Sequence, residues 1–339
     1  MNWRVAGSGP AAFVLAAFVL AALTVAGITA GDAARASVQH EVVGISSLVF
    51  SPDGKLLVGA SADGTVRLWS PATGQPVGSP RHISLGSRGS VNAVAFSPGG
   101  TLLASASADG TVRLWNPVTG QAHGPVLRNP GSQAGAKAVA FSPDGKLLAS
   151  AYADSTVQLW NPATGQPVGS PFQIGAGSSA SVNAVAFSPD GKLLASAYAD
   201  GTVRLWNPST GQAHGAPLGT GAQASPSGLV FSPDGSLLAS AYADGTVRLW
   251  APATGQPVGS PLQIGPDSVT ALAFSPDGMQ LAFAYGGAVT IWVRVADRPG
   301  GQHNVSWLAI LVFAIVIAVP ALAVITTVRG IRRLKKAYQ

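Results

Sequence analysis

A segment of about 45 residues occurs six times in this chain, and this repeat constrains the possible folds more than any other feature. The pentapeptide FSPDG begins at Phe50, Phe141, Phe187, Phe231 and Phe274, and FSPGG begins at Phe96. Successive copies are 46, 45, 46, 44 and 43 residues apart. This period matches a unit of four strands and exceeds the roughly 20–34 residues of several other common repeats.

Each copy divides into short strands separated by turns. SVNAVAFS (181–188) and KLLASAYA (192–199) have the apolar character of buried strands, and the SPDG turn between them supplies proline and glycine where a tight turn needs them. Asp-Gly then forms a two-residue hairpin before TVRLW (202–206), which is β-branched and aromatic. PVGSP (167–171) suits an edge strand. No helical pattern fits between these segments, so the repeats predict an all-β protein.

The repeat VNAVAFSPDGKLLASAYADGTVRLWNPSTGQ (182–212) resembles the WD-repeat β-propeller family, and the resemblance extends over residues 36–298. It implies a six-bladed β-propeller within residues 31–300, in which each repeat supplies the outer strand of one blade and three inner strands of the next. Six inner triplets and five outer segments are present. We therefore expect residues 34–43 to supply the sixth outer strand, so that an N-terminal edge strand closes the ring. A seventh blade would need a copy that the sequence does not contain.

Two charge-free segments flank the repeats and predict membrane-type helices. Residues 307–328 would form a transmembrane helix of about 33 Å, and the basic tail 329–339 should stay in the cytoplasm by the positive-inside rule. Residues 11–30 follow a short cytoplasmic segment, 1–10, and are either a signal peptide or an N-terminal transmembrane anchor. Both alternatives place the propeller at the cell membrane, outside the cytoplasm. The composition, rich in Ala, Gly and Pro, favours a bacterial source.

The net charge of +6 does not indicate nucleic-acid binding. Residues 31–300 carry 14 Lys/Arg and 14 Asp/Glu, so the excess lies at Arg4 and in the tail 329–339. A nucleic-acid interface needs a basic face on the folded domain. The chain has no cysteine, which excludes disulfides and thiolate chemistry.

Two residue types recur at fixed positions in the repeats. A tryptophan ends the third strand of each copy, at Trp69, Trp115, Trp160, Trp206, Trp250 and Trp292. An aspartate precedes the hairpin glycine at Asp63, Asp109, Asp154, Asp200 and Asp244. In the family this aspartate joins a hydrogen-bonded group with a strand hydroxyl, a histidine and the tryptophan, but no copy here has the Gly-His pair. We interpret the tryptophans as packing residues and the aspartates as turn residues.

Catalytic and metal-binding patterns are lacking. The five histidines share no spacing, and each SPDG turn offers one carboxylate, far fewer than the six or more oxygen ligands of calcium. We expect no enzyme activity, no metal and no cofactor.

The loops between repeats differ most, and two of them are basic. Residues 81–90 and 128–137 contain Arg81, His82, Arg88, Arg128 and Lys137 and no acid. Binding residues concentrate on loops of rigid scaffolds, so these five residues are the candidate rim for a protein or an anionic polymer. The alternative is that they are scattered, solvated charges. Four further arginines, expected along the outer wall, occupy the third strands at Arg67, Arg113, Arg204 and Arg248.

The sequence therefore predicts a membrane-anchored scaffold that binds a protein or another ligand. Two alternatives remain. One is a transmembrane sensor that relays to the cytoplasm through residues 329–339, and the other is an enzyme that uses the central funnel of the propeller.

Overall fold

The computed structural model describes residues 45–310, except 83–88, 131, 174–179, 220–223, 276, 279, 286–287 and 296–305. Several predicted segments lie outside the described residues: 1–10, 11–30, 34–43, most of 307–328, and 329–339.

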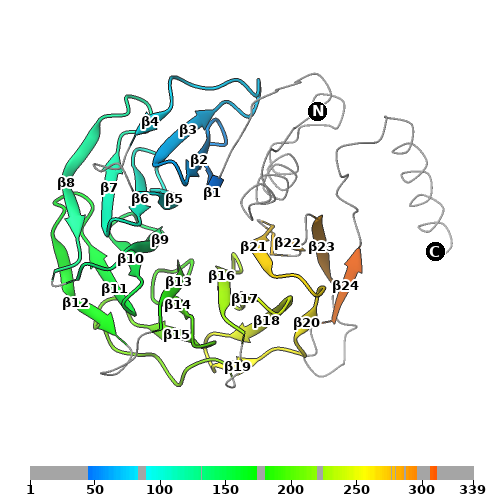
Figure 1. Ribbon diagram of the computed structural model, residues 1–339. Helices are drawn as coiled ribbons and strands as arrows, with labels where there is room; N and C mark the ends of the chain where they lie inside the picture. The colour runs from blue at the N-terminus through cyan, green and yellow to red at the C-terminus, as the bar shows by residue number, and fades with distance from the viewer. Residues whose placement is uncertain are drawn as a thin grey trace, which may run out of the picture.

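The described residues form six antiparallel sheets, one for each repeat (Figure 1). The innermost strands are β1 (Ile45–Phe50), β5 (Val91–Phe96), β9 (Ala136–Phe141), β13 (Val182–Phe187), β16 (Pro226–Phe231) and β21 (Val269–Phe274). The second strands are β2 (Leu57–Ser61), β6 (Leu103–Ser107), β10 (Leu148–Tyr152), β14 (Leu194–Tyr198), β17 (Leu238–Tyr242) and β22 (Gln280–Tyr285). The third strands are β3 (Thr65–Trp69), β7 (Thr111–Trp115), β11 (Thr156–Trp160), β15 (Val203–Trp206), β18 (Thr246–Ala251) and β23 (Ala288–Val295).

The outer strands vary more than the inner ones. They are β4 (Arg81–His82), β8 (Ala122–Arg128), β12 (Pro167–Gln173), β19 (Gln256–Pro257), β20 (Leu262–Gln263) and β24 (Ser306–Ile310). In the fourth sheet the outer segment forms two isolated bridges, Val203–Leu218 and Trp206–Ala213. Glycine and proline in these segments limit regular pairing to short lengths, as is common at sheet edges.

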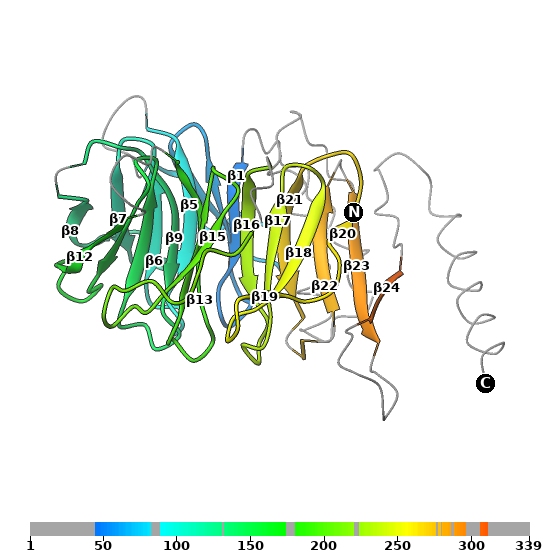
Figure 2. The ribbon, with the colours of Figure 1, turned by 90° about the horizontal axis from the view of Figure 1, so that it is seen from below.

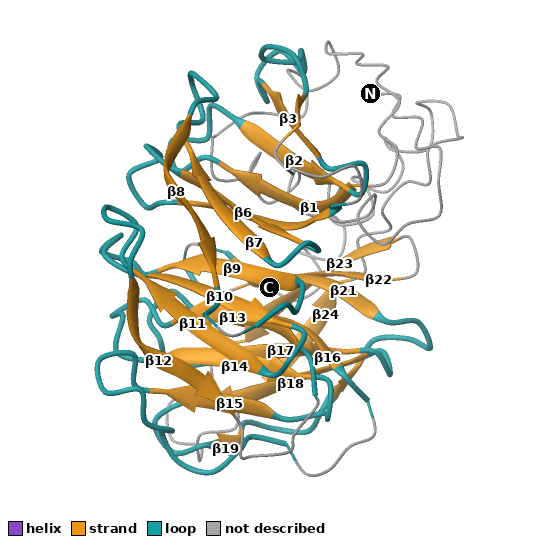
Figure 3. Ribbon diagram, turned by 60° about the vertical axis from the view of Figure 1, so that its left-hand side comes forward, coloured by secondary structure: helices purple, strands orange, loops and turns teal. Residues whose placement is uncertain are grey.

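The sheets follow one another around a centre toward which the innermost strands face (Figure 1). Contacts between innermost strands join each sheet to the next from β1 to β21. Figure 2 shows the strands of successive sheets standing side by side, with their turns at two ends. We call the end with the Asp-Gly turns the hairpin end, and the opposite end the SPDG end. Strands and loops make up the described part of the molecule (Figure 3).

The hydrophobic core lies between the sheets. At the junction of the second and third sheets, Val112, Leu114 and Leu127 pack with Leu148 and Trp160 of the next repeat. Equivalent clusters fill the other described junctions. Since each sheet buries its faces against its neighbours, a single repeat has no core of its own.

The outer edge of the sixth sheet differs from the prediction. Residues 34–43 were expected beside β23, but the structure places β24 there, with Trp292 opposite Ala309. β24 follows β23 closely in the chain, so this antiparallel pairing closes only a short loop. The first four residues of the predicted helix 307–328 therefore lie in a strand. Within the described part of the chain, no helix has the length and apolar character needed to cross a membrane.

The SPDG end is uniform from repeat to repeat. Five turn prolines lie against the turn glycine of the next sheet, so that a Cβ on Gly145 would stand 3.5 Å from Pro98 and one on Gly191 would stand 3.6 Å from Pro143. The turn serine donates a hydrogen bond to the turn aspartate, as Ser142 does to Asp144 at 2.7 Å. These contacts hold neighbouring turns in one arrangement.

Candidate functional site

The hairpin aspartates bind within their own turns. The Asp63 Oδ1 atom accepts hydrogen bonds from the backbone nitrogen of Thr65 at 2.9 Å and from its Oγ1 at 2.6 Å. Asp109, Asp154, Asp200 and Asp244 make the same pair of contacts with the threonine two residues further on. At least one oxygen of each carboxylate is thus engaged in fixing the hairpin.

Four of the tryptophans bond to a serine that was not among the candidate residues. Trp160 Nε1 donates to Ser150 Oγ at 2.7 Å, and both residues are buried. Trp115, Trp206 and Trp250 donate in the same way to Ser105, Ser196 and Ser240. The sequence could have revealed this partner, because a serine stands ten residues before the tryptophan in these four repeats. Trp69 is 6% exposed and has Gly59 at that position, and the side chain of Trp292 lies outside the described atoms.

Arg81 replaces an apolar residue that other repeats place on the outer strand. It pairs with Val66, where the equivalent partners of the later repeats are Leu127, Phe172, Leu218 and Leu262. The Arg81 guanidinium lies against Gly120 of the next repeat and donates hydrogen bonds to the carbonyls of Pro117 at 3.2 Å and Val118 at 3.3 Å.

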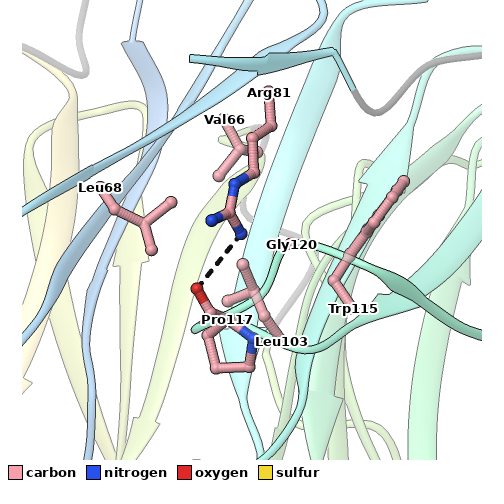
Figure 4. A pocket seen from close by; sticks show the side chains of 7 residues that line it. All are labelled: Val66, Leu68, Arg81, Leu103, Trp115, Pro117 and Gly120. Carbon is pink, nitrogen blue, oxygen red and sulfur yellow. Dashed lines mark hydrogen bonds between the residues drawn. The ribbon is translucent and has the colours of Figure 1, made fainter. Parts of the chain in front are cut away.

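Arg81 also lines a small pocket between the first two sheets (Figure 4). The other residues of its lining are Val66, Leu68, Leu103, Trp115, Pro117 and Gly120. Trp115 is only half-buried here, whereas Phe172 stacks on Trp206 with ring centroids 5.4 Å apart. The contacts of Arg81 thus link two repeats.

Three other candidate rim residues stand at the hairpin end. His82 is exposed and pairs with Thr65, and Arg128 is exposed and donates to the carbonyl oxygen of Asp109 at 3.3 Å. Lys137 is exposed on the innermost strand β9. Arg88 lies outside the described residues. The structure therefore separates Arg81, which binds inside a junction, from three exposed bases at one end.

The third-strand arginines are less exposed than a position on the outer wall would make them. Arg113 is 8% exposed, and burial lowers the pKa of its guanidinium. Arg248 lies over the ring of Tyr242, 4.4 Å from its centroid, and pairs with Asp244 at 3.6 Å. These side chains are spaced two residues from the tryptophan on the same strand, so they share its face and pack against the neighbouring sheet.

The loop of residues 128–135 is docked onto two hairpins. Asn129 donates to Thr156 Oγ1 at 2.8 Å, and Ser132 donates to Asp154. A Cβ on Gly110 would stand 2.8 Å from the carbonyl oxygen of Ala134. These contacts give the basic loop one conformation relative to the sheets.

Lys137 interrupts a series of hydrogen bonds between neighbouring innermost strands. The second residue of such a strand donates to backbone oxygen on the next strand: Ser46 to Val91, Asn92 to Ala136 at 2.8 Å, Asn183 to Pro226 at 3.1 Å, and Ser227 to Val269 at 2.6 Å. Lys137 occupies the same position in the third repeat. Its ammonium has no hydrogen-bond partner among the described residues, and the side chain is exposed.

The titratable groups with shifted pKa values have local causes. Burial raises the pKa of Tyr152 to about 12 and also raises the pKa of Tyr198 and Tyr242. The hydrogen bond from the turn serine holds the pKa of Asp53 below its ordinary value. In the portion of the chain that the structure covers, no group of three His, Cys, Asp or Glu residues could hold a metal ion.

Six antiparallel sheets of three to five strands, with similar turns at one end and varied loops at the other, define a repeat scaffold of the β-propeller class. The profile of the family described as "WD domain, G-beta repeat" matches the chain six times, at residues 36–70, 78–116, 124–161, 169–207, 215–251 and 259–292. Because these matches cover more than half of the sequence, the chain belongs to the WD-repeat family.

One solved structure of similar fold is a protein made by design. It is the crystal structure of the computationally designed Ika8 protein, in a packing of space group P63. The two sequences are 30% identical, and the match covers 75% of this chain and 72% of the designed chain, with a TM-score of 0.57. No curated protein matches the sequence.

Proposed function

We propose that this WD-repeat protein is a protein-interaction scaffold held at the cell membrane, with its propeller outside the cytoplasm and no chemistry of its own. The observation that carries the proposal is the difference between the two ends of the sheets. The SPDG end repeats one arrangement of turns, whereas the hairpin end carries loops that differ between repeats and present His82, Arg128 and Lys137 to solvent. Variable loops on a repeated scaffold are a usual place for partner binding.

The absence of chemistry is proposed from the state of the titratable groups. The hairpin aspartates bind the threonines of their own turns. The tyrosines with raised pKa values are buried between sheets, where they stay neutral at physiological pH. The raised pKa values follow from burial of the phenols between sheets, which differs from a cleft in which an acid and a base converge on a substrate.

Membrane anchoring is proposed from the two charge-free segments. If β24 ends at Ile310, the apolar residues 311–328 remain for a span, and 18 residues of helix extend about 27 Å. This length lies within the range of transmembrane helices. The five cations of residues 329–339 favour a cytoplasmic tail.

Cysteine labelling tests the orientation, because the natural chain has no cysteine. Val118 is 78% exposed, so a Val118→Cys variant should react with an impermeant maleimide on intact cells. An Ala337→Cys variant should react only after the cells are opened. Labelling of Ala337→Cys on intact cells, with Val118→Cys protected, would reverse the orientation.

Two triple variants test the binding end by crosslinking in the native membrane. Changing Arg88, Arg128 and Lys137 to serine should remove the crosslinked partner. Changing Lys55, Lys146 and Lys192 to serine at the SPDG end should keep it; these lysines lie 3.4, 3.7 and 3.5 Å from turn aspartates. The crosslink should weaken with salt, because the Debye length falls from about 10 Å at 0.1 M to about 3 Å at 1 M. Equal crosslinking of both variants would place the binding surface elsewhere.

A sensor that relays to the cytoplasm is the second candidate, favoured by the cluster of five cations in residues 329–339. Such a cluster attracts anionic lipid or an acidic protein. If the protein is a sensor, deleting these residues should abolish the binding of its cytoplasmic partner. If the protein is only an anchored scaffold, the same deletion should leave the binding of its extracytoplasmic partner unchanged, and no cytoplasmic partner should be found before or after the deletion.

A further inference from the structure

The junction between the third and fourth sheets lacks a hydrogen bond that the next junction makes. At the next junction, Asn183 Nδ2 donates to Ser225 Oγ at 2.9 Å and to the carbonyl oxygen of Pro226 at 3.1 Å. Ser181 is the residue equivalent to Ser225, and its Oγ is buried without a hydrogen-bond partner. Lys137 stands at the position of Asn183, so the residue that would bind Ser181 has been replaced.

Lysine at this position lowers the stability of the fold, whereas the residues found there in other repeats do not. Asparagine occupies the position in the second and fourth repeats and serine in the first and fifth, and each forms the link to the next sheet. A buried hydroxyl without a partner is unfavourable, and so is the loss of a link between sheets. Local departures from a rule that the rest of a chain obeys are expected at functional sites.

The two groups provide two hydrogen-bond donors at the hairpin end of the innermost strands. The Ser181 hydroxyl is unsatisfied, and the Lys137 ammonium is a cation on an exposed and flexible side chain. In the equivalent pair the Asn183 side chain reaches Ser225 Oγ, so position 137 is the place from which a side chain can reach Ser181 across the junction. The nearby hairpin carboxylate of Asp154 is bound by Ser132 and Thr156.

We propose that Lys137 and Ser181 form a carboxylate-binding site for an acidic side chain of a protein partner. The proposal rests on the proposed scaffold function and names one group that the partner must carry. A carboxylate has two oxygens, one for the ammonium and one for the hydroxyl, and a single negative charge that one lysine balances. A phosphate group has more charge and more oxygens than these two donors satisfy.

A titration of the full-length protein with a small carboxylate tests the site. The probes are acetyl-glutamate amide and its neutral counterpart, acetyl-glutamine amide, followed by NMR in protein that contains 13C-labelled lysine. We expect a saturable shift of the Lys137 side-chain signal with the glutamate probe, with a dissociation constant in the millimolar range, and no saturable shift with the glutamine probe. No saturation by about 100 mM glutamate probe overturns the proposal.

The Lys137→Asn variant is the decisive change, because asparagine occupies this position in the second and fourth repeats and forms the link to the next sheet there. It should lose saturable binding of the glutamate probe and raise the melting temperature by about 2–4 °C, since the asparagine would satisfy Ser181. Unchanged probe binding, or a melting temperature that does not rise, overturns the proposal. Lys137→Met removes the charge without supplying the link, so it should lose binding with no gain in melting temperature.

Serine variants provide a matched control. Ser181→Ala should weaken binding of the glutamate probe several-fold without lowering the melting temperature, because the hydroxyl it removes is buried and has no partner to lose. Ser225→Ala should leave the probe affinity unchanged and lower the melting temperature, because it breaks the bond from Asn183. Equal effects of the two variants on probe binding contradict the site.

Inorganic phosphate distinguishes the class of anion. Tighter binding of phosphate than of the glutamate probe, lost in Lys137→Asn, would contradict the assignment to a carboxylate. The failure of this site is separable from the failure of the scaffold function. If the Lys137→Asn variant still crosslinks to the partner in the native membrane, the scaffold function is supported and the carboxylate site is contradicted.

Discussion

Two reasons favour glycine at the hairpin position of the fifth repeat, Gly245, although Ser155 occupies the equivalent position of the third repeat with a φ of +72°. Gly245 has a φ of +75°, which favours glycine, and a Cβ there would overlap the carbonyl oxygen of Gly265 in the following loop. Gly54 in an SPDG turn has a φ of +69°, but a Cβ there would meet nothing within 4 Å. The hairpin glycine therefore permits the loop to dock as well as the turn to form.

These two glycines predict different costs for the same substitution. Gly54→Ala should lower the free energy of unfolding by about 1 kcal/mol, because only the backbone conformation is unfavourable. Gly245→Ala should lower it by about 3 kcal/mol or more, because the loop must also move. Denaturant unfolding measures both. Equal losses would show that the loop does not press on the hairpin.

The bond between tryptophan and serine predicts a second graded effect. Ser150→Ala leaves the buried indole nitrogen of Trp160 without its acceptor and should cost about 1–3 kcal/mol of unfolding free energy. Ser105→Ala should cost less, because Trp115 is half-buried and water can replace the serine. Urea titration of the two variants compares them. A larger loss for Ser105→Ala would contradict this account.

At the scale of the strand, most of the fold could be predicted from the sequence, because turn and strand residues agree in most copies. The SPDG and Asp-Gly turns fixed the strand boundaries, and the family match confirms the repeats. The serine partner of the tryptophan was missed because a small residue in a buried strand is expected to fill space, not to accept a hydrogen bond. In the sequence alone, Arg81 and Lys137 cannot be told apart, because each is a basic residue in a variable loop. The structure separates them: Arg81 pairs with Val66 inside a junction, whereas Lys137 is exposed at the position that Asn183 holds in the next repeat.

The edge of the sixth sheet was not predictable from periodicity. Residues 306–310 read SWLAI, and a short apolar run of this kind suits the start of a buried helix as well as a strand. The choice depends on the open edge of β23, which is a feature of the folded sheet. The structure pairs that edge with β24.

Proline substitutions test which segment holds this edge. In an antiparallel pair, the N–H groups of successive residues point alternately toward and away from the partner. One of the variants Leu308→Pro and Ala309→Pro should therefore remove a hydrogen bond to β23 and lower the melting temperature. Val38→Pro, in the segment predicted for this edge, should leave the melting temperature unchanged. The reverse pattern would show that the N-terminal segment pairs with β23.

At the scale of the whole molecule, the two ends of the sheets differ in how they are held. The SPDG end is joined from sheet to sheet by contacts of proline with glycine, and the turns that contain an aspartate are each held by a bond from their own serine. The hairpin end is held by loops that differ in each repeat. Uniform contacts at one end keep neighbouring sheets in place, which leaves the sequence at the other end free to vary.

The uniform end predicts how the molecule responds to acid. Hydrogen bonds from the turn serines lower the pKa of Asp53, Asp144 and Asp190 below the ordinary value of 3.8. A carboxyl with a lower pKa in the folded state stabilises the protein above pH 3.8, and this contribution is lost as the pH falls below that value. The free energy of unfolding should therefore decrease below about pH 4, as urea titrations at several pH values would measure.

The control for the acid response is a variant in which Asp53, Asp144 and Asp190 are all asparagine. Asparagine keeps an acceptor for the turn serine and does not titrate, so the unfolding free energy of this variant should change less between pH 5 and pH 3. The hairpin aspartates remain in both proteins, which makes the difference specific to the SPDG end. If the two proteins lose stability in parallel as the pH falls, the acid response comes from groups elsewhere, and the turn aspartates would act only through their geometry.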